Sequence, residues 1–138
     1  MITNLSDQLI RDEGLRLHPY RDSVGKLTIG IGRNLDDKGI SLAEADALLA
    51  NDIKDATDSL EANFPWTMDL DDARKGALLN LTFNMGIRGL SAFVKFLAAM
   101  KTGQWLTAKA ELLNSAADHE EPERIARLAL QIETGFWQ

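Results

Sequence analysis

Residues 13–34 read E-G-L-R-L-H-P-Y-R-D-S-V-G-K-L-T-I-G-I-G-R-N. The stretch begins where an amphipathic helix should end and continues into a glycine-rich β-hairpin. Its turn is expected at D-S-V-G, residues 22–25, because Asp is favoured at the first and Gly at the fourth position of a type I turn. Residues 27–32 then alternate branched apolar side chains with Thr or Gly, as a strand does. The two glycines weaken this strand, which makes sense if another backbone or a ligand approaches closely there.

Glu13 has an unfavourable position at the end of the first helix. Apolar residues at helical spacing predict this helix, with Thr3 or Asn4 as its N-cap and Gly14 as the residue that ends it. A carboxylate at the carboxyl end of a helix opposes the helix dipole by roughly 0.3–1 kcal/mol, and the same field favours the protonated carboxyl. A protonated carboxyl suits a general acid. The alternative is a solvated surface glutamate beside a lysine or arginine.

Asp22 and Thr28 each have an ordinary structural explanation, Asp22 as a turn former and Thr28 as a strand residue. Together with Glu13 they form the pattern E, eight residues, D, five residues, T. Cleavage of a glycosidic bond needs one acid to protonate the leaving oxygen and a second carboxylate to activate water or bond to the sugar. The pattern therefore indicates a two-carboxylate hydrolase.

This pattern, with Y-x-D-x-x-G-x-x-T-I-G-I-G, resembles the active-site hairpin of the phage-type lysozymes, the endolysins typified by that of the T-even bacteriophages. The resemblance continues in the same order along the chain. It includes L-T-F-N-M-G at 81–86, G-Q-W-L-T-A-K-A at 103–110, and E-P-E-R-I-A-R at 121–127 before T-G-F-W. Matches in one order over nearly the whole chain identify it as similar to this family.

The resemblance implies an α+β fold that is mostly α-helical and forms a single lysozyme domain over residues 1–138. A small N-terminal β-hairpin lobe, residues 14–40, would be joined by a connecting helix, residues 42–63, to a C-terminal helical bundle, residues 69–138. The helix at residues 1–13 would pack on that helical lobe.

The resemblance also implies a muramidase that cleaves the β-1,4 bond between N-acetylmuramic acid and N-acetylglucosamine in peptidoglycan. Glu13 would be the acid, and Asp22 and Thr28 would handle the water, with inversion at the sugar. Arg124 matches the arginine that contacts the catalytic glutamate, although an exposed arginine paired with Glu120 or Glu121 is the alternative. Phe83 and Asn84 match the wall of the sugar cleft, or are ordinary helix residues.

Three positions depart from the T-even pattern. That member has histidine and leucine where this chain has Arg33 and Asn34, and it has a tryptophan near the position of Ala117. Contacts at these positions are therefore not carried over.

The sequence predicts helices over most of the remaining chain. Ser41 and Glu44 form a capping box that opens a helix of about 22 residues ending before Phe64-Pro65. Four shorter helices follow. We expect Asp69 or Asp71 to cap one that ends at Gly86, Ser91 to cap one that ends at Gly103, one around Trp105, and one at Glu123–Thr134 with Pro122 first and Gly135 last. The expected core of this lobe contains Phe93, Phe96, Met100, Trp105, Leu128 and Ile132.

Composition argues against several kinds of site and partner. The 138 residues, 45% of them hydrophobic, suffice for a real core, and the absence of cysteine excludes disulfides and thiolate metal sites. A net charge of −6 argues against nucleic acid as a partner. His18 and His119 show no spacing with other metal ligands, so we expect no metal and no cofactor.

No apolar run approaches the length of a membrane span, and the N-terminus lacks the regions of a signal peptide. We therefore expect no membrane insertion and synthesis in the host cytoplasm. The protein would act in the periplasm or on the cell wall after release through a holin, as a monomer.

Two other functions remain open. A lytic transglycosylase cuts the same bond but closes an anhydro ring with one acid, so Asp22 and Thr28 disfavour it. A catalytically silent wall-binding module on the same scaffold is disfavoured because all three pattern residues are present.

Overall fold

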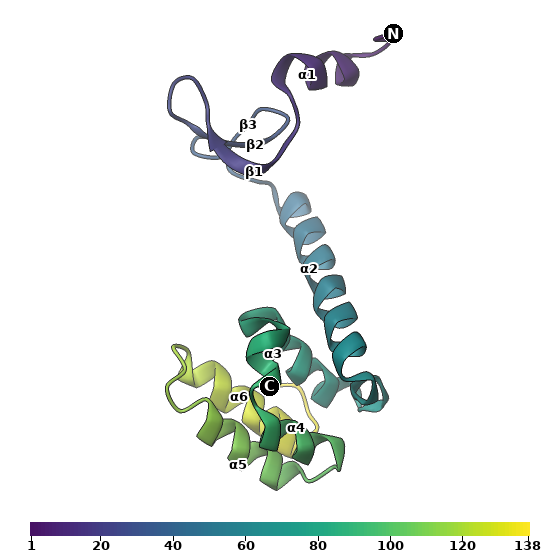
Figure 1. Ribbon diagram of the computed structural model, residues 1–138. Coiled ribbons are helices and arrows are strands. Elements are labelled where there is room, and N and C mark those ends of the chain that lie inside the picture. Colours follow the sequence, from purple (N-terminus) through teal and green to yellow (C-terminus); the bar gives the residue numbers. More distant parts are fainter. The chain divides into compact units, whose positions relative to one another are not determined.

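The computed structural model describes all residues, Met1–Gln138, and forms two compact units, Met1–Leu48 and Leu49–Gln138. The chain contains six α-helices, one 3-10 helix and one three-stranded antiparallel sheet (Figure 1). The predicted fold class, α+β and mostly α-helical, is confirmed.

Unit 1 begins with helix α1, Leu5–Glu13. Asn4 is its N-cap, because the Asn4 side chain accepts the backbone N–H of Asp7 at 2.9 Å. Gly14 ends the helix with φ +77°, a conformation that favours glycine, and donates its N–H to the carbonyl of Ile10. Both ends agree with the sequence prediction, and Glu13 is the last helical residue.

The sheet contains β1 (Arg16–Arg21), β2 (Leu27–Gly30) and β3 (Arg33–Asn34), in that order and antiparallel throughout. Thr28 on the central strand lies opposite Tyr20 of β1 and Asn34 of β3. The register of β1 is irregular between Arg16 and Tyr20, where Pro19 has no N–H to donate to a neighbouring strand.

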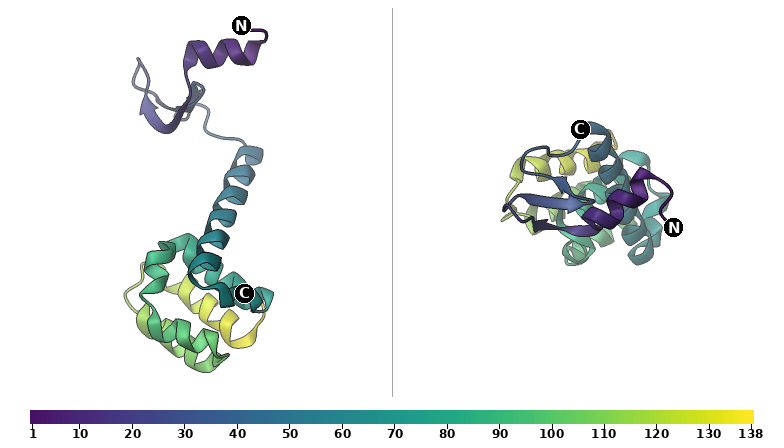
Figure 2. Two further views of the ribbon diagram at one scale, coloured as in Figure 1. Left: turned by 45° about the vertical axis from the view of Figure 1, so that its right-hand side comes forward. Right: turned by 90° about the horizontal axis from the view of Figure 1, so that it is seen from above.

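Helix α2, Leu42–Asn63, is one uninterrupted helix of 22 residues (Figure 2). Its start is the predicted capping box. Glu44 donates its backbone N–H to Ser41 Oγ at 3.1 Å, and Ser41 donates its backbone N–H to Glu44 Oε1 at 2.9 Å.

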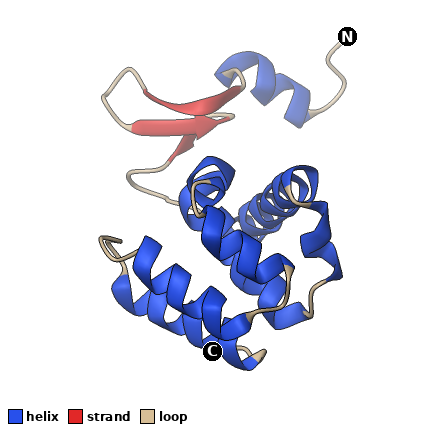
Figure 3. Ribbon diagram, turned by 60° about the horizontal axis from the view of Figure 1, so that its bottom comes forward, coloured by secondary structure: helices blue, strands red, loops and turns tan.

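Unit 2 is a helical bundle (Figure 3). After the last turns of α2 it contains η1 (Pro65–Asp69), α3 (Asp72–Ser91), α4 (Val94–Lys101), α5 (Trp105–Ser115) and α6 (Pro122–Thr134). Helix α5 packs against α4 and α6, and α3 packs against α6. The C-terminal Trp137 lies on α3 at Gly76, where a side chain on residue 76 would overlap the indole ring.

The core of unit 2 lies between these helices. Of the expected core residues, Phe96, Met100, Leu128 and Ile132 are buried. Phe93 and Trp105 are partly buried and pack against the same cluster. The guanidinium of Arg74 also stacks on the Trp105 ring, 4.1 Å from its centroid, and donates to the carbonyls of Ile132 and Glu133 at the end of α6.

One helix boundary differs from the prediction. Gly86 breaks the helical conformation with φ +75°, as expected, but the chain resumes a helical turn over residues 87–91. Ser91 therefore ends α3 and does not cap α4, because its hydroxyl donates back to the carbonyl of Ile87 at 2.6 Å. Helix α4 begins after Phe93 with no side-chain cap.

The helix starting at Asp72 has Asp71 as its N-cap, with the carboxylate accepting the backbone N–H of Arg74. Helix α6 begins with Pro122 and ends at Gly135, as predicted. That the chain forms one lysozyme domain, and that helix 1–13 packs on the helical lobe, stay predictions.

None of the helices combines the length and the apolar character that a membrane crossing requires. No group of three or more His, Asp or Glu side chains is arranged to hold a metal ion.

Candidate active site

Glu13 lies against the backbone of Gly32. A Cβ atom on residue 32 would come within 2.7 Å of Glu13 Oε2 and 3.0 Å of Glu13 Cδ. Gly32 also has φ +69°, which L side chains rarely adopt. The absence of a side chain at residue 32 therefore lets the end of α1 place its last carboxyl on the turn between β2 and β3.

Asp22 begins the turn between β1 and β2, and the backbone N–H of Gly25 donates to its carbonyl at 3.0 Å, as predicted for D-S-V-G. Its Oδ1 accepts the backbone N–H groups of Val24 at 3.0 Å and Lys26 at 2.8 Å. No side chain or backbone donor contacts Oδ2. The turn thus fixes the direction of the carboxylate through one oxygen and leaves the other as an acceptor for water or sugar.

Thr28 lies on the central strand and is only 3% exposed. Its hydroxyl donates to the carbonyl of Lys26 at 2.8 Å. The backbone N–H of Lys26 also donates to Asp22 Oδ1. The backbone of Lys26 therefore contacts both predicted catalytic side chains, Asp22 through its N–H and Thr28 through its carbonyl.

The charged side chains next to the hairpin are paired with one another. Lys26 Nζ donates to Asp37 Oδ1 at 3.0 Å, and this hydrogen bond raises the pKa of Lys26 and lowers the pKa of Asp37. Arg33 Nη1 donates to Glu44 Oε1 at 2.7 Å and thereby ties β3 to the start of α2. The Arg33 hydrogen bond, followed by those from Ser41, lowers the pKa of Glu44 to about 2.

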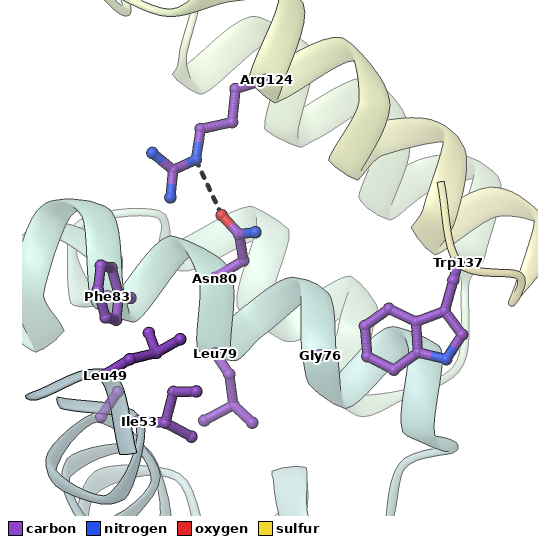
Figure 4. Close-up of a pocket in the computed structure, with 9 residues that line it drawn as sticks. Leu49, Ile53, Gly76, Leu79, Asn80, Phe83, Arg124 and Trp137 are labelled. Carbon is purple, nitrogen blue, oxygen red and sulfur yellow. Dashed lines mark hydrogen bonds between the residues drawn. The ribbon is translucent and has the colours of Figure 1, made fainter. Parts of the chain in front are cut away.

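In unit 2, Arg124 and Asn84 belong to one hydrogen-bond network. Arg124 Nη1 and Asn84 Nδ2 both donate to Glu121 Oε2, each at 3.1 Å. Arg124 Nε donates to Asn80 Oδ1 at 2.9 Å (Figure 4). The pairing of Arg124 with Glu121 is the alternative that the sequence left open for this arginine.

Phe83 and Arg124 also line one pocket of about 410 Å³ in unit 2. Figure 4 shows the pocket between residues of α2, α3, α6 and the C-terminal Trp137. Its surface is mostly apolar, with the Arg124 guanidinium and the Asn80 amide as its polar groups.

The comparison with known proteins decides the family. The sequence profile of the phage lysozymes matches residues 11–124. The chain belongs to the phage lysozyme family. This lysozyme is 32% identical over 164 aligned positions to two Dictyostelium discoideum proteins named probable T4-type lysozyme 1 and 2, with 98% of this chain and 96% of each relative covered. It is also 28% identical to the pre-baseplate central spike protein Gp5 of Enterobacteria phage T4, where 96% of this chain matches 28% of that protein.

Family membership makes the chain a lysozyme, a peptidoglycan hydrolase. Within this lysozyme the structure places Glu13, Asp22 and Thr28 on one unit, on α1, the first turn and the central strand. No hydrogen bond joins Glu13 directly to Asp22 or Thr28. In unit 2, the structure brings Arg124 and Asn84 together through Glu121. The predicted contact of Arg124 with Glu13 stays a prediction.

Sequence reasoning missed the partners that hold this lysozyme's side chains in place. Asn80 and His119 contact Arg124 and Asn84, respectively, but each is separated from its partner by more than thirty residues of chain, and no local pattern marks such a pair. Gly32 did carry a signal, since a glycine inside a strand pattern indicates a close approach. The sequence did not reveal that the approaching group is Glu13.

Proposed function

We propose that this protein is an endolysin that cleaves the β-1,4 bond between N-acetylmuramic acid and N-acetylglucosamine by acid/base catalysis. The observation that supports the proposal is the arrangement of Asp22. Two backbone N–H groups hold Oδ1 and leave Oδ2 without a partner in the protein. The hairpin that begins its turn at Asp22 also carries Thr28, and Glu13 at the end of α1 lies against its Gly32.

In this mechanism Glu13 donates its proton to the glycosidic oxygen as the bond to the leaving sugar breaks. Asp22 accepts a proton from the attacking water through Oδ2, and Thr28 helps to hold that water. The oxygen of the water then bonds to the anomeric carbon from the opposite face, so the configuration inverts. Glu13 and Asp22 exchange protons with solvent before the next turnover.

The substrate side of the proposal rests on unit 2. Phe83 offers a partly exposed ring on α3, and Asn84 offers a partly exposed amide beside it. We assign both to the wall that contacts the glycan strand. Arg124 is assigned to the support of Glu13.

The biological role belongs to the same proposal. We place synthesis in the host cytoplasm, release through a holin, and action as a monomer in the periplasm or on the cell wall. The absence of cysteine and of a membrane-spanning helix is compatible with this route.

Mass spectrometry of digested peptidoglycan tests the reaction. Hydrolysis leaves reducing muramic acid ends, whereas a lytic transglycosylase leaves anhydro ends that are lighter by one water. We expect reducing ends only. Anhydro ends would replace the proposal with transglycosylation, and an undigested wall would favour a silent wall-binding module.

A further inference from the structure

His119 lies in the loop between α5 and α6 and joins that loop to α3. Its Nδ1 accepts the backbone N–H of Glu121 at 2.9 Å, and its Nε2 lies 2.9 Å from Asn84 Oδ1. A nitrogen that accepts a hydrogen bond carries no proton, so in the neutral ring the proton is on Nε2. Nε2–H therefore donates to Asn84 Oδ1.

The other end of the Asn84 amide is held as well. Asn84 Nδ2 donates to Glu121 Oε2, and Glu121 is itself fixed by His119 through its backbone N–H. A flipped amide would direct Oδ1 at the Glu121 carboxylate and Nδ2 at the Nε2–H donor. Both contacts would be repulsive, so His119 and Glu121 together define one orientation of Asn84.

This orientation leaves the amide able to bind a ligand. A side-chain amide donates two hydrogens and accepts through two lone pairs, and the contacts with His119 and Glu121 use one of each. Asn84 is partly exposed, so its second N–H and second lone pair remain for another molecule. The acetamido groups of a peptidoglycan strand carry the complementary C=O and N–H.

We propose that His119 is a positioning residue that fixes the Asn84 amide in the orientation in which it binds an acetamido group of the glycan strand. The inference rests on the proposed function, because it takes Asn84 to contact the strand. His119 acts through Asn84 and Glu121 and does not itself touch the sugar. Without its Nε2–H, only the Glu121 contact restrains the terminal amide torsion of Asn84, which is intrinsically broad.

Two substitutions separate the two hydrogen bonds of the ring. His119→Asn keeps an acceptor near Nδ1 for the Glu121 N–H but is too short to reach Asn84. His119→Gln keeps a donor near Nε2 that reaches Asn84 Oδ1. Binding of soluble, uncross-linked peptidoglycan strands is measured by calorimetry in a Glu13→Gln background, in which we expect turnover to be roughly two to four orders of magnitude slower.

We expect His119→Asn to raise the Kd about 3–10-fold, the range for loss of one neutral hydrogen bond. Asn84→Ala should have a similar effect, and the double variant should bind no more weakly than Asn84→Ala alone. His119→Gln should stay within about twofold of the parent. Full additivity of the two substitutions, or unchanged binding by His119→Asn, would overturn the inference.

A second measurement needs no variant of His119. Long-range proton–nitrogen NMR spectra of the wild-type protein report which ring nitrogen carries the proton, and His18→Gln identifies the signals of the second histidine. We expect the Nε2–H form for His119. The Nδ1–H form would contradict the hydrogen bonds on which the inference depends.

The binding assay also separates this inference from the proposed function. Strands that bind with the expected pattern but are not cleaved by the wild-type protein would remove the proposed function and keep the role of His119. Strands that are cleaved but whose binding ignores Asn84 and His119 would remove only the role of His119. Strands that do not bind at all would remove both.

Discussion

At the scale of single residues, the site depends on how the backbone accommodates two acidic side chains. Asp22 is held by the N–H groups of Val24 and Lys26, and Glu13 lies where Gly32 has no side chain. Neither arrangement requires a salt bridge. Substitutions that preserve the backbone but alter one carboxyl or one contact therefore test the chemistry separately from folding.

Asp22→Asn tests the base. Asn keeps an oxygen that accepts from Val24 and Lys26 and is itself favoured in turns, so the hairpin should persist. The amide cannot take a proton from water, so hydrolysis should fall by about two to four orders of magnitude. The release of reducing ends is measured together with the thermal midpoint. If Asp22 only forms the turn, the variant will be nearly as active as the wild type.

Gly32→Ala tests the position of Glu13, with Gly30→Ala as a matched control. Both glycines have φ near +70°, and an L residue in the left-handed region costs about 1–2 kcal/mol, so both variants should lose similar stability. A Cβ atom on residue 32 would clash with the Glu13 carboxyl, whereas a Cβ atom on residue 30 would contact nothing. We expect about a 10–100-fold lower kcat/KM for Gly32→Ala than for Gly30→Ala, since small misplacements of a catalytic group are costly. Equal activities would contradict the placement of Glu13.

At the scale of secondary-structure elements, the junction between β3 and α2 is sensitive to acid. Arg33 and Ser41 hold the Glu44 carboxylate and lower its pKa from 4.5 to about 2. Between these pH values the unfolded chain binds more protons than the folded chain. The stabilisation is therefore complete above about pH 4.5 and is lost as the pH falls towards about 2.

Glu44→Gln should lower the thermal midpoint at neutral pH and flatten its decline between about pH 4.5 and 2. Circular dichroism melts across this range measure both effects. Glu61→Gln is the control, because Glu61 lies on the same helix and has no ion pair. If the thermal midpoint of Glu44→Gln falls with decreasing pH as steeply as that of the wild type, this junction does not contribute to acid sensitivity.

The elements also show where sequence reasoning succeeds. The capping box of Ser41 and Glu44 and the turn at Asp22 could be predicted because their hydrogen bonds join residues within four positions of each other. Ser91 was wrongly predicted to be an N-cap because a serine before an apolar run is typical of one. In the structure the helix resumes after Gly86, and the Ser91 hydroxyl donates back to the carbonyl of Ile87. The contacts of Asn84 with His119 and of Glu13 with Gly32 depend on the fold and have no local pattern.

At the scale of the whole molecule, we expect the net charge of −6 to slow encounter with an anionic wall. The basic side chains on the hairpin are Arg16, Arg21, Lys26 and Arg33, and Arg124 belongs to the network with Glu121 in unit 2. All but Arg16 have an acidic partner within 4 Å, and Arg16 stacks on Tyr20. These five side chains therefore offer little unpaired positive charge to offset the net charge of the molecule.

Moderate salt should increase the initial rate of wall lysis. Repulsion acts over roughly 10 Å at 0.1 M salt and further at lower salt, so encounters should be slowest in dilute buffer. The measurement is the initial rate of turbidity loss from about 10 mM to 200 mM salt at fixed pH. A steep monotonic fall in rate would show that a local field controls encounter and not the net charge.

The central claim is that Glu13 supplies the proton for cleavage, and Glu13→Gln tests it most directly. The measurement is the rate at which reducing ends are released from purified peptidoglycan, compared with wild type. We predict a fall of roughly two to four orders of magnitude. The thermal midpoint should be unchanged or higher, because removing an acid from the carboxyl end of α1 relieves its conflict with the helix dipole. A variant that releases reducing ends within about threefold of the wild-type rate would contradict the claim.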